Sequence, residues 1–400
     1  MTVNKPELLA PAGDFECLNT AINFGADAIY CGGDFMQMRA EKVGFTREDL
    51  KKAAEIKHKA RKKLYVTVNC FAKNSEIEPL KEYAKYLYEI GADAAIVSDI
   101  GVLDVIKKTT PDMPVHISTQ ANCTNYQSAN VYYNLGASRI VLARELSIED
   151  IAVLRANTPK ELELEAFVHG AMCMSYSGRC LISSFLNNRS GNRGECTQPC
   201  RWSYYLVEKK RPDEYFEIIE ENQATAVLSS KDLNSITFLD KLADAGITSF
   251  KIEGRMKTPF YVATAVNAYR RAIDGGDVAE LNDELNCISH RPYSSGFYFG
   301  ELINNTFNDG LYHSDAKFIG VVKSCENGVA KIEMRNAFFV GDILEIVSPH
   351  LLKKSIKVEK IFNSEGEETD RATLVQEIVS VPVTEDLYAG DFLRRRETCN

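Results

Sequence analysis

A phrase of one glycine followed by mostly apolar residues recurs along the first half of the chain. The first copy spans residues 25–30 (GADAIY), related copies begin at Gly91 and Gly136, and a fainter copy begins at Gly246. Each copy follows an amphipathic helical stretch and leads into a short apolar run. Glycine suits the left-handed position just past a helix. An unbroken apolar run is typical of a parallel strand that is buried on both faces. The repeat therefore predicts an α/β protein with a parallel sheet.

Eight apolar runs predict eight strands. They lie at Glu7–Ala10, Ala26–Tyr30, Leu64–Val68, Ala94–Val97, Val115–Ser118, Arg139–Leu142, Leu162–Val168 and Ser249–Ile252. The helices between them begin at suitable N-caps, among them Asp14, Thr46 and Ser147, and Asp49 follows Thr46 at capping-box spacing. Eight parallel strands that alternate with helices predict a (β/α)8, TIM-like barrel. Residues 224–229 (ATAVLS) also have strand character, so an open doubly wound sheet stays the alternative.

The pattern changes after about residue 311, where short β-rich runs are separated by turn-like sequences. The runs lie at Phe318–Val322, Ala330–Met334, Asp342–Val347, Ser355–Ile361 and Thr373–Val379. They predict a small antiparallel β-barrel of a size typical of an accessory domain. We therefore divide the chain into a catalytic domain, residues 1–310, and a β-barrel domain, residues 311–400, which we consider as an RNA-binding accessory.

Composition and charge narrow the class of protein. The first residues, MTVNKPELLAPAG, lack the basic region and apolar run of a secretory signal. No stretch approaches the roughly 18 apolar residues that span a bilayer. We expect a soluble, cytoplasmic protein with no membrane partner. The net charge of −9 argues against nucleic-acid binding by the molecule as a whole, and basic groups such as residues 394–396 are expected to be solvated faces.

Four of the eleven cysteines lie close together in the sequence, whereas the other seven are scattered and are expected to be buried thiols. The spacing of Cys173, Cys180, Cys196 and Cys200 is C-x6-C-x15-C-x3-C, inside a loop at residues 169–202 that is rich in glycine and arginine. Disulfides are not expected in a reducing compartment. Zinc sites usually contain C-x2-C knuckles, which are absent from this loop. Four thiolates from one long loop favour an iron–sulfur cluster of the 4Fe–4S type. Zinc, or a chance group of core cysteines, stays an alternative.

Polar residues follow the predicted strands at their carboxyl ends, where TIM barrels build their active sites. They are Asn69, Asp99, Gln120, Arg144, Glu145, His169, Glu253 and Arg255. Together they predict a polar pocket beneath the cysteine loop. His169 is a candidate general acid or base, or a donor to a cluster sulfur; the alternative is a histidine that caps its strand.

A second group of charges alternates along the last strand. Lys251, Glu253 and Arg255 lie on one side of it, where they would hold a small carboxylate. The alternative is an ion-pair ladder that closes the barrel. No G-x-S-x-G, H-E-x-x-H or phosphate-loop motif is present.

Three stretches resemble the collagenase-like peptidase family U32. They are residues 7–33, residues 165–184 with the first two cysteines of the loop, and residues 251–257 (KIEGRMK) together with KDL at 231–233. The resemblance covers nearly the whole chain. The family name implies proteolysis, yet other branches of the family hydroxylate RNA bases or ubiquinone precursors without molecular oxygen. The resemblance implies that those branches use an iron–sulfur cluster on cysteines that match Cys173, Cys180, Cys196 and Cys200.

The length of the chain and its C-terminal β domain resemble the branch that makes 5-hydroxyuridine at the wobble position of tRNA and depends on prephenate. The resemblance implies a tRNA uridine hydroxylase that turns the base out of its stack into the barrel mouth. From their positions we expect catalytic roles for His169, Glu253 and Arg255, and the resemblance implies prephenate as the carboxylate that Arg255 would hold. The residues expected to bind substrate are Asn69, Gln120, Lys251, Arg179, Arg193 and Arg201, the last three through tRNA phosphates. The alternatives are a metal-assisted peptidase and a non-enzymatic iron–sulfur RNA-binding protein.

Overall fold

The computed structural model describes most of the chain. The described residues are 5–38, 44–173, 175–202, 206–208, 211–216, 230–300, 312–350 and 354–397. Contacts divide the chain into two compact units. The first unit comprises Met1–Leu18, Asp27–Met256 and His290–Tyr312; the second comprises Asn19–Ala26, Lys257–Ser289 and His313–Asn400.

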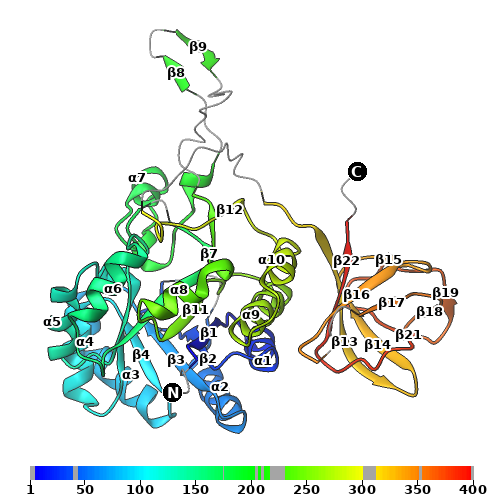
Figure 1. Ribbon diagram of the computed structural model, residues 1–400, viewed down its shortest axis with the longest axis horizontal. Helices are drawn as coiled ribbons and strands as arrows, with labels where there is room; N and C mark the ends of the chain where they lie inside the picture. The colour runs from blue at the N-terminus through cyan, green and yellow to red at the C-terminus, as the bar shows by residue number, and fades with distance from the viewer. Residues whose placement is uncertain are drawn as a thin grey trace. The chain divides into compact units, whose positions relative to one another are not determined.

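Eight parallel strands of the first unit close into a barrel (Figure 1). They are β1 (Glu7–Pro11), β2 (Ala28–Gly32), β3 (Lys63–Val68), β4 (Ala94–Val97), β5 (Val115–Ile117), β6 (Arg139–Val141), β7 (Glu163–Ala171) and β11 (Ser249–Ile252). Strand β11 pairs with both β1 and β7, which closes the ring. All eight predicted strands and the TIM-like barrel are therefore confirmed, and the open sheet is wrong. Residues 224–229 lie outside the described residues.

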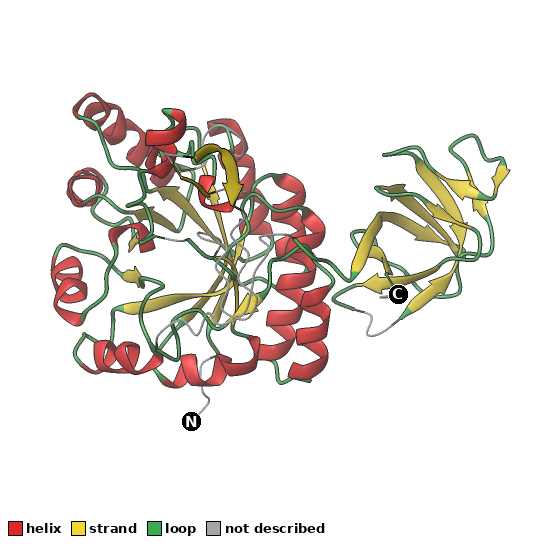
Figure 2. Cartoon of the chain, turned by 90° about the horizontal axis from the view of Figure 1, so that it is seen from above, coloured by secondary structure: helices red, strands yellow, loops and turns green. Residues whose placement is uncertain are grey.

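Helices surround the ring of strands (Figure 2). Those of the first half of the chain are α1 (Phe15–Asn23), α2 (Arg47–Lys59), α3 (Ile77–Glu89), α4 (Ile100–Thr109), α5 (Tyr126–Asn134) and α6 (Ile148–Ala156). Thr46 forms the predicted capping box with Asp49, and Ser147, predicted as an N-cap, forms one with Asp150. The four glycines of the recurring phrase have φ angles from +77° to +101°. A side chain would be strained in that conformation, which is why the phrase begins with glycine.

Strand β7 extends beyond the ring of barrel strands. Its last residues pair antiparallel with β10 (Asp232–Asn234), and β10 pairs with β12 (Tyr293–Ser294). Between β7 and β10 lie the cysteine loop, with α7 (Ile182–Asn187), and the hairpin of β8 (Leu206–Glu208) and β9 (Arg211–Phe216). Helix α8 (Leu239–Asp244) leads into β11. The extension therefore anchors both ends of the cysteine segment at the carboxyl end of the barrel.

The second unit contains α9 (Pro259–Ile273), α10 (Val278–Asn286) and an antiparallel sheet that curls about its own core. The sheet comprises β13 (Ala316–Glu326), β14 (Val329–Met334), β16 (Ile343–Val347), β17 (Ser355–Lys357), β18 (Ile361–Phe362), β19 (Glu368–Thr369), β21 (Ile378–Pro382) and β22 (Phe392–Arg396). A separate pair is formed by β15 (Phe338–Phe339) and β20 (Arg371–Ala372). The predicted antiparallel β domain is confirmed. The run predicted at 373–379 is mostly turn, because the strand begins only at Ile378.

No helix within the described residues is both long and apolar enough to cross a membrane.

Candidate functional site

The cysteine loop carries four thiols beyond the carboxyl end of β7. Cys173 follows the strand directly, Cys180 precedes α7, and Cys200 lies on the short helix η4 (Pro199–Arg201). Cys173 and Cys196 are exposed, whereas Cys180 and Cys200 are half-buried. Burial raises the pKa of the Cys200 thiol, and the charges of the other three thiolates raise it further by repulsion. Such repulsion acts only between groups that lie near one another.

The chemistry of this donor set fits the predicted cluster. All four thiols lie on one segment, each of them exposed or half-buried, and thiolates of this kind are the ligands of iron–sulfur clusters. Among the described His, Cys, Asp and Glu side chains, no three stand in the arrangement that holds a single metal ion. The metal centre therefore stays a prediction. Of the scattered cysteines, Cys17, Cys31, Cys70, Cys123 and Cys287 are buried, as expected.

An ion pair ties the cysteine loop to the segment that follows β3. Nη2 of Arg193 lies 2.5 Å from Oε1 of Glu76, and Nη1 donates to the carbonyl of Phe71 at 3.1 Å. The hydrogen bond from Arg193 holds the pKa of Glu76 below its usual value. Asn192 accepts from the Phe71 amide at 3.2 Å. Arg193, which was predicted to contact phosphates, is thus engaged in holding the loop in place.

The other two predicted phosphate contacts lie on the same loop. Arg179 donates to Oδ1 of Asn122 at 2.8 Å, and Asn122 donates to the carbonyl of Ser177 at 3.1 Å. Arg201 donates to the hydroxyl of Tyr312 at 3.0 Å. Arg201 is partly exposed, so its guanidinium keeps access to solvent.

Four buried polar atoms have no hydrogen-bond partner among the described residues; three follow barrel strands at their carboxyl ends and the fourth lies on the cysteine loop. They are Oδ1 of Asn69, Oε1 of Gln120, Nδ2 of Asn192 and Nε of Arg144. A Cβ atom on Gly178 would lie 2.2 Å from Oε1 of Gln120 and 3.5 Å from Nδ2 of Asn192, so both atoms face the same glycine of the loop. An unsatisfied buried polar atom costs about 1–3 kcal/mol. A group of four is therefore best explained by polar atoms that a ligand or water supplies.

Arg255 lies at the carboxyl ends of β2 and β3, as its position after the last strand predicts. Its buried guanidinium donates through Nη1 to Oε1 of Gln37 at 3.2 Å and to Oγ1 of Thr67 at 3.1 Å. Both acceptors are neutral. A Cβ atom on Gly32 would lie 1.9 Å from Oε1 of Gln37 and 2.9 Å from Nη1 of Arg255. Glycine at this position is what lets the two side chains cross the end of β2.

Glu253, directly after β11, contacts the side chain of Arg144 and the backbone of His169. Nη2 of Arg144 lies 3.6 Å from Oε2 of Glu253, and its guanidinium carbon lies 4.0 Å from the centre of the Phe167 ring. The amide of Glu253 donates to the carbonyl of His169 at 2.9 Å. The buried ring of His169 lies 5.5 Å from that of Tyr293. Glu145 follows Arg144 in sequence, and burial raises the pKa of its carboxyl. Glu145 is thus a proton-transfer candidate that the sequence signalled only by its place after β6.

Lys251, on β11, is buried beside the same aromatic rings as Arg144 and Arg255. Its Nζ lies 5.5 Å from the centre of the Phe167 ring, and the Arg255 guanidinium carbon lies 5.9 Å from the centre of the Tyr30 ring. Nζ of Lys251 is 2.8 Å from Oε1 of Glu165 and 4.4 Å from the centre of the Tyr30 ring. Glu165 also pairs with Arg139 at 2.9 Å, and Arg139 pairs with Glu7 at 2.7 Å. Burial lowers the pKa of Lys251. The structure therefore places Lys251 in the ion-pair ladder that was the alternative to a binding role.

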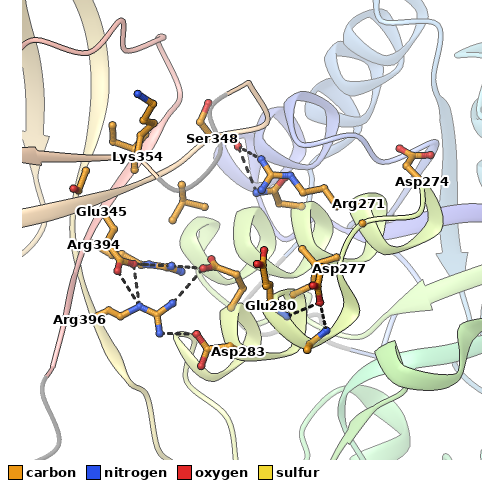
Figure 3. A pocket seen from close by; sticks show the side chains of 18 of the residues that line it. Arg271, Asp274, Asp277, Glu280, Asp283, Glu345, Ser348, Lys354, Arg394 and Arg396 are labelled. Carbon is orange, nitrogen blue, oxygen red and sulfur yellow. Dashed lines mark hydrogen bonds and ion pairs between the residues drawn. The ribbon is translucent and has the colours of Figure 1, made fainter.

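The second unit has a cavity of about 1270 Å³ (Figure 3), and none of the predicted site residues lines it. Six carboxylates and four basic side chains line it. Most of these charges pair with one another: Arg394 and Arg396 both bind Glu284 and Glu345. The expectation that residues 394–396 form a solvated face is wrong for Arg394, which is buried. The role of this unit in RNA binding stays a prediction.

Comparisons with known proteins match the chain along its length. The model of peptidase family U32 matches residues 13–307, and that of the peptidase family U32 C-terminal domain matches residues 314–394. The tRNA hydroxylation protein P of Escherichia coli is 34% identical, over 96% of this chain and 95% of that protein. Its namesake from Haemophilus influenzae is 32% identical, over 99% and 97%. A protein named collagenase from Porphyromonas gingivalis is 33% identical, over 99% of each chain.

Proposed function

Since the chain belongs to peptidase family U32, we propose that it is an RNA-modifying enzyme that hydroxylates tRNA. Two relatives that it matches over nearly their whole length carry the name tRNA hydroxylation protein P. In its finer form, the proposal is that the wobble uridine becomes 5-hydroxyuridine, with a 4Fe–4S cluster as cofactor and prephenate as co-substrate.

The observation that carries the proposal is the set of unsatisfied polar atoms on the cysteine loop and after the barrel strands, two of which lie close to Gly178. Oδ1 of Asn69 and Oε1 of Gln120 are acceptors, whereas Nδ2 of Asn192 and Nε of Arg144 are donors. A uracil base presents carbonyl acceptors and an N–H donor on its edge. A site that retains both kinds of group suits such an edge, provided that the base is turned out of its stack.

Each part of the site has its own task in this proposal. Cys173, Cys180, Cys196 and Cys200 would hold the cluster, which supplies the redox chemistry when bound. Arg255 would bind a carboxylate of the co-substrate through its paired N–H groups. Arg144 and Glu253, which follow β6 and β11, would orient the base, and the buried His169 and the half-buried Glu145 would hold or move a proton.

The test is mass spectrometry of tRNA nucleosides from a deletion strain that carries the wild-type gene or a variant. We expect 5-hydroxyuridine to disappear on deletion and to stay absent when any one of the four cysteines is alanine. Anaerobically purified wild type should contain about four irons per chain, and each cysteine variant should lose most of them. Cys325→Ala is the control, since this half-buried cysteine lies on β13, outside the cysteine loop.

Other outcomes would favour the alternative functions, a peptidase or a non-enzymatic RNA-binding protein. Stoichiometric zinc without iron after anaerobic preparation would exclude the cluster. Unchanged tRNA nucleosides together with peptide cleavage would favour the peptidase, the activity that the name of one relative suggests. Unchanged nucleosides with a full cluster and tight tRNA binding would favour a non-enzymatic protein.

A further inference from the structure

Large apolar side chains are exposed on the cysteine loop. Phe185 on α7 is 84% exposed, and Trp202 directly after η4 is 48% exposed. Tyr176, Leu181 and Leu186 of the same loop are exposed as well, as is Tyr312, whose hydroxyl accepts from Arg201. Figure 1 shows α7 beyond the end of β7. We call the set Tyr176, Phe185, Trp202 and Tyr312 the aromatic surface.

The exposure of Phe185 follows from how α7 is fixed. Ser183 is buried, and its hydroxyl accepts from the Thr197 amide at 3.1 Å. Asn187 donates to the Thr197 hydroxyl at 2.7 Å. Helix α7 also contacts η4, which precedes Trp202. Because the polar side of α7 is bound to the loop, Phe185 is directed to solvent on the other side.

The charge of this segment differs from that of the chain. Residues 173–202 contain four arginines and one glutamate, a net charge of +3, in a chain whose net charge is −9. Aromatic side chains interleaved with arginines are typical of surfaces that bind single-stranded nucleic acid, where bases stack on rings and cations follow the phosphates. A surface for another protein needs no such excess of one charge.

The aromatic surface and two of the unsatisfied polar atoms are linked through Gly178. This glycine lies between Tyr176 and Arg179 in sequence, and a Cβ atom on it would lie close to Oε1 of Gln120 and Nδ2 of Asn192. A base held by these atoms would therefore have its neighbours in the strand next to the aromatic surface. Stacking of those neighbours would offset part of the cost of turning the target base out.

We propose that the aromatic surface binds the single-stranded loop of the RNA substrate by stacking the bases next to the target nucleotide. The proposal rests on the proposed function for the identity of the substrate. It assigns recognition to Phe185 and Trp202, which contribute stacking, and to Arg201, which contributes a phosphate contact.

The test measures binding of an RNA stem-loop to the iron-loaded full-length protein. Phe185→Ala and Trp202→Ala should each weaken binding about tenfold, and the double variant on the order of a hundredfold. The salt dependence should stay unchanged, because neither variant removes a cation; Arg201→Ala should reduce the salt slope by about one. A fully paired duplex should bind all these proteins alike. Tyr88→Ala, which removes an aromatic side chain of 48% exposure from α3, is the matched control.

Iron content and melting temperature show whether each variant is folded. Wild-type affinity for the stem-loop in the folded double variant would overturn the proposal. If the double variant keeps wild-type affinity for the stem-loop but loses self-association in sedimentation, the surface binds a second copy of the chain, and this result would overturn the proposal too. If the deletion strain keeps its 5-hydroxyuridine but the variants lose stem-loop affinity, the proposed function fails while the RNA-binding surface stands.

Discussion

Two cations near the end of the last strand have different partners in the folded protein. Lys251 lies on β11, but the strand ends at Ile252, so the alternation expected for Lys251, Glu253 and Arg255 does not extend to the last two. Lys251 reaches Glu165 within the barrel, whereas Arg255 reaches Gln37 and Thr67 at its mouth. The position of each residue relative to the strand, rather than its charge, decides which partners it has.

Substitution of Arg255 tests the carboxylate site. We expect Arg255→Lys to act almost like Arg255→Ala, because lysine keeps the charge but loses the planar pair of donors. Loss of one charge-assisted hydrogen bond costs about 1.5–3 kcal/mol, or on the order of tenfold to a hundredfold in co-substrate binding. The measurement is the fraction of hydroxylated wobble uridine in the complemented deletion strain, together with iron content. Arg47→Lys, an exposed arginine on α2, is the control. Full modification with a full cluster in both variants would make Arg255 purely structural.

The cysteine loop is the element on which the proposed site depends, and a few long-range bonds hold it. The longest in sequence join it to the segment after β3, through Arg193, Asn192 and Phe71. The pKa of Glu76 is lowered, so its ion pair with Arg193 stabilises the fold fully above the ordinary carboxyl pKa of 4.5. This contribution is lost as the pH falls through the lowered pKa. At neutral pH the ion pair is intact.

The variant Glu76→Gln should therefore loosen the loop at neutral pH. Removal of this partly exposed pair costs about 1 kcal/mol, so we expect cleavage within residues 175–202 by a dilute protease to rise on the order of fivefold. Peptide mapping of the cleavage sites measures it. Glu78→Gln is the control, because Glu78 pairs only with Lys81 among the described residues, on the surface of α3. Cleavage at the wild-type rate in Glu76→Gln would show that the ion pair does not hold the loop.

At the scale of the whole molecule, the second unit combines helices and sheet from distant parts of the chain. The Phe318 ring on β13 stacks on Phe260 of α9, with centroids 5.0 Å apart. Phe392 of β22 lies 5.8 Å from Phe24, and Arg394 pairs with Glu284 of α10 at 2.7 Å. Helix α9 is buried along nearly all of its length. The helices and the sheet of this unit therefore depend on one another.

Deletion of residues 312–400 should destabilise what remains rather than release an intact barrel. It exposes Phe24 and Phe260 and leaves Glu284 without its arginine partners, so we expect a lower melting temperature, aggregation and binding of an apolar dye. Light scattering and dye fluorescence measure both effects. Lys317→Ala, which removes an exposed side chain at the start of β13, is the control. A truncated chain that stays monomeric and binds no dye would show that the sheet is an independent domain.

The sequence by itself determined the elements of the barrel, because the rules that form them are local. A glycine past a helix, an apolar run of strand length and a capping box at Thr46 each depend on neighbours within a few residues. The sequence also shows the clustering of Cys173, Cys180, Cys196 and Cys200, because these residues lie close together along the chain. Strand β22 was missed, because its arginines pair with Glu284 and Glu345, far away in the sequence.

Only the tertiary structure decided which polar side chains have partners. The sequence predicted a phosphate contact for Arg193, whereas in the structure Arg193 pairs with Glu76, 117 residues away in sequence. The sequence likewise did not reveal the exposure of Phe185 or the unsatisfied polar atoms of Asn69, Gln120 and Asn192. Local patterns report whether a residue is buried, but the partner of a buried polar group depends on how loops from different strands meet. These loops meet because the barrel closes, which brings the carboxyl ends of all eight strands to one face.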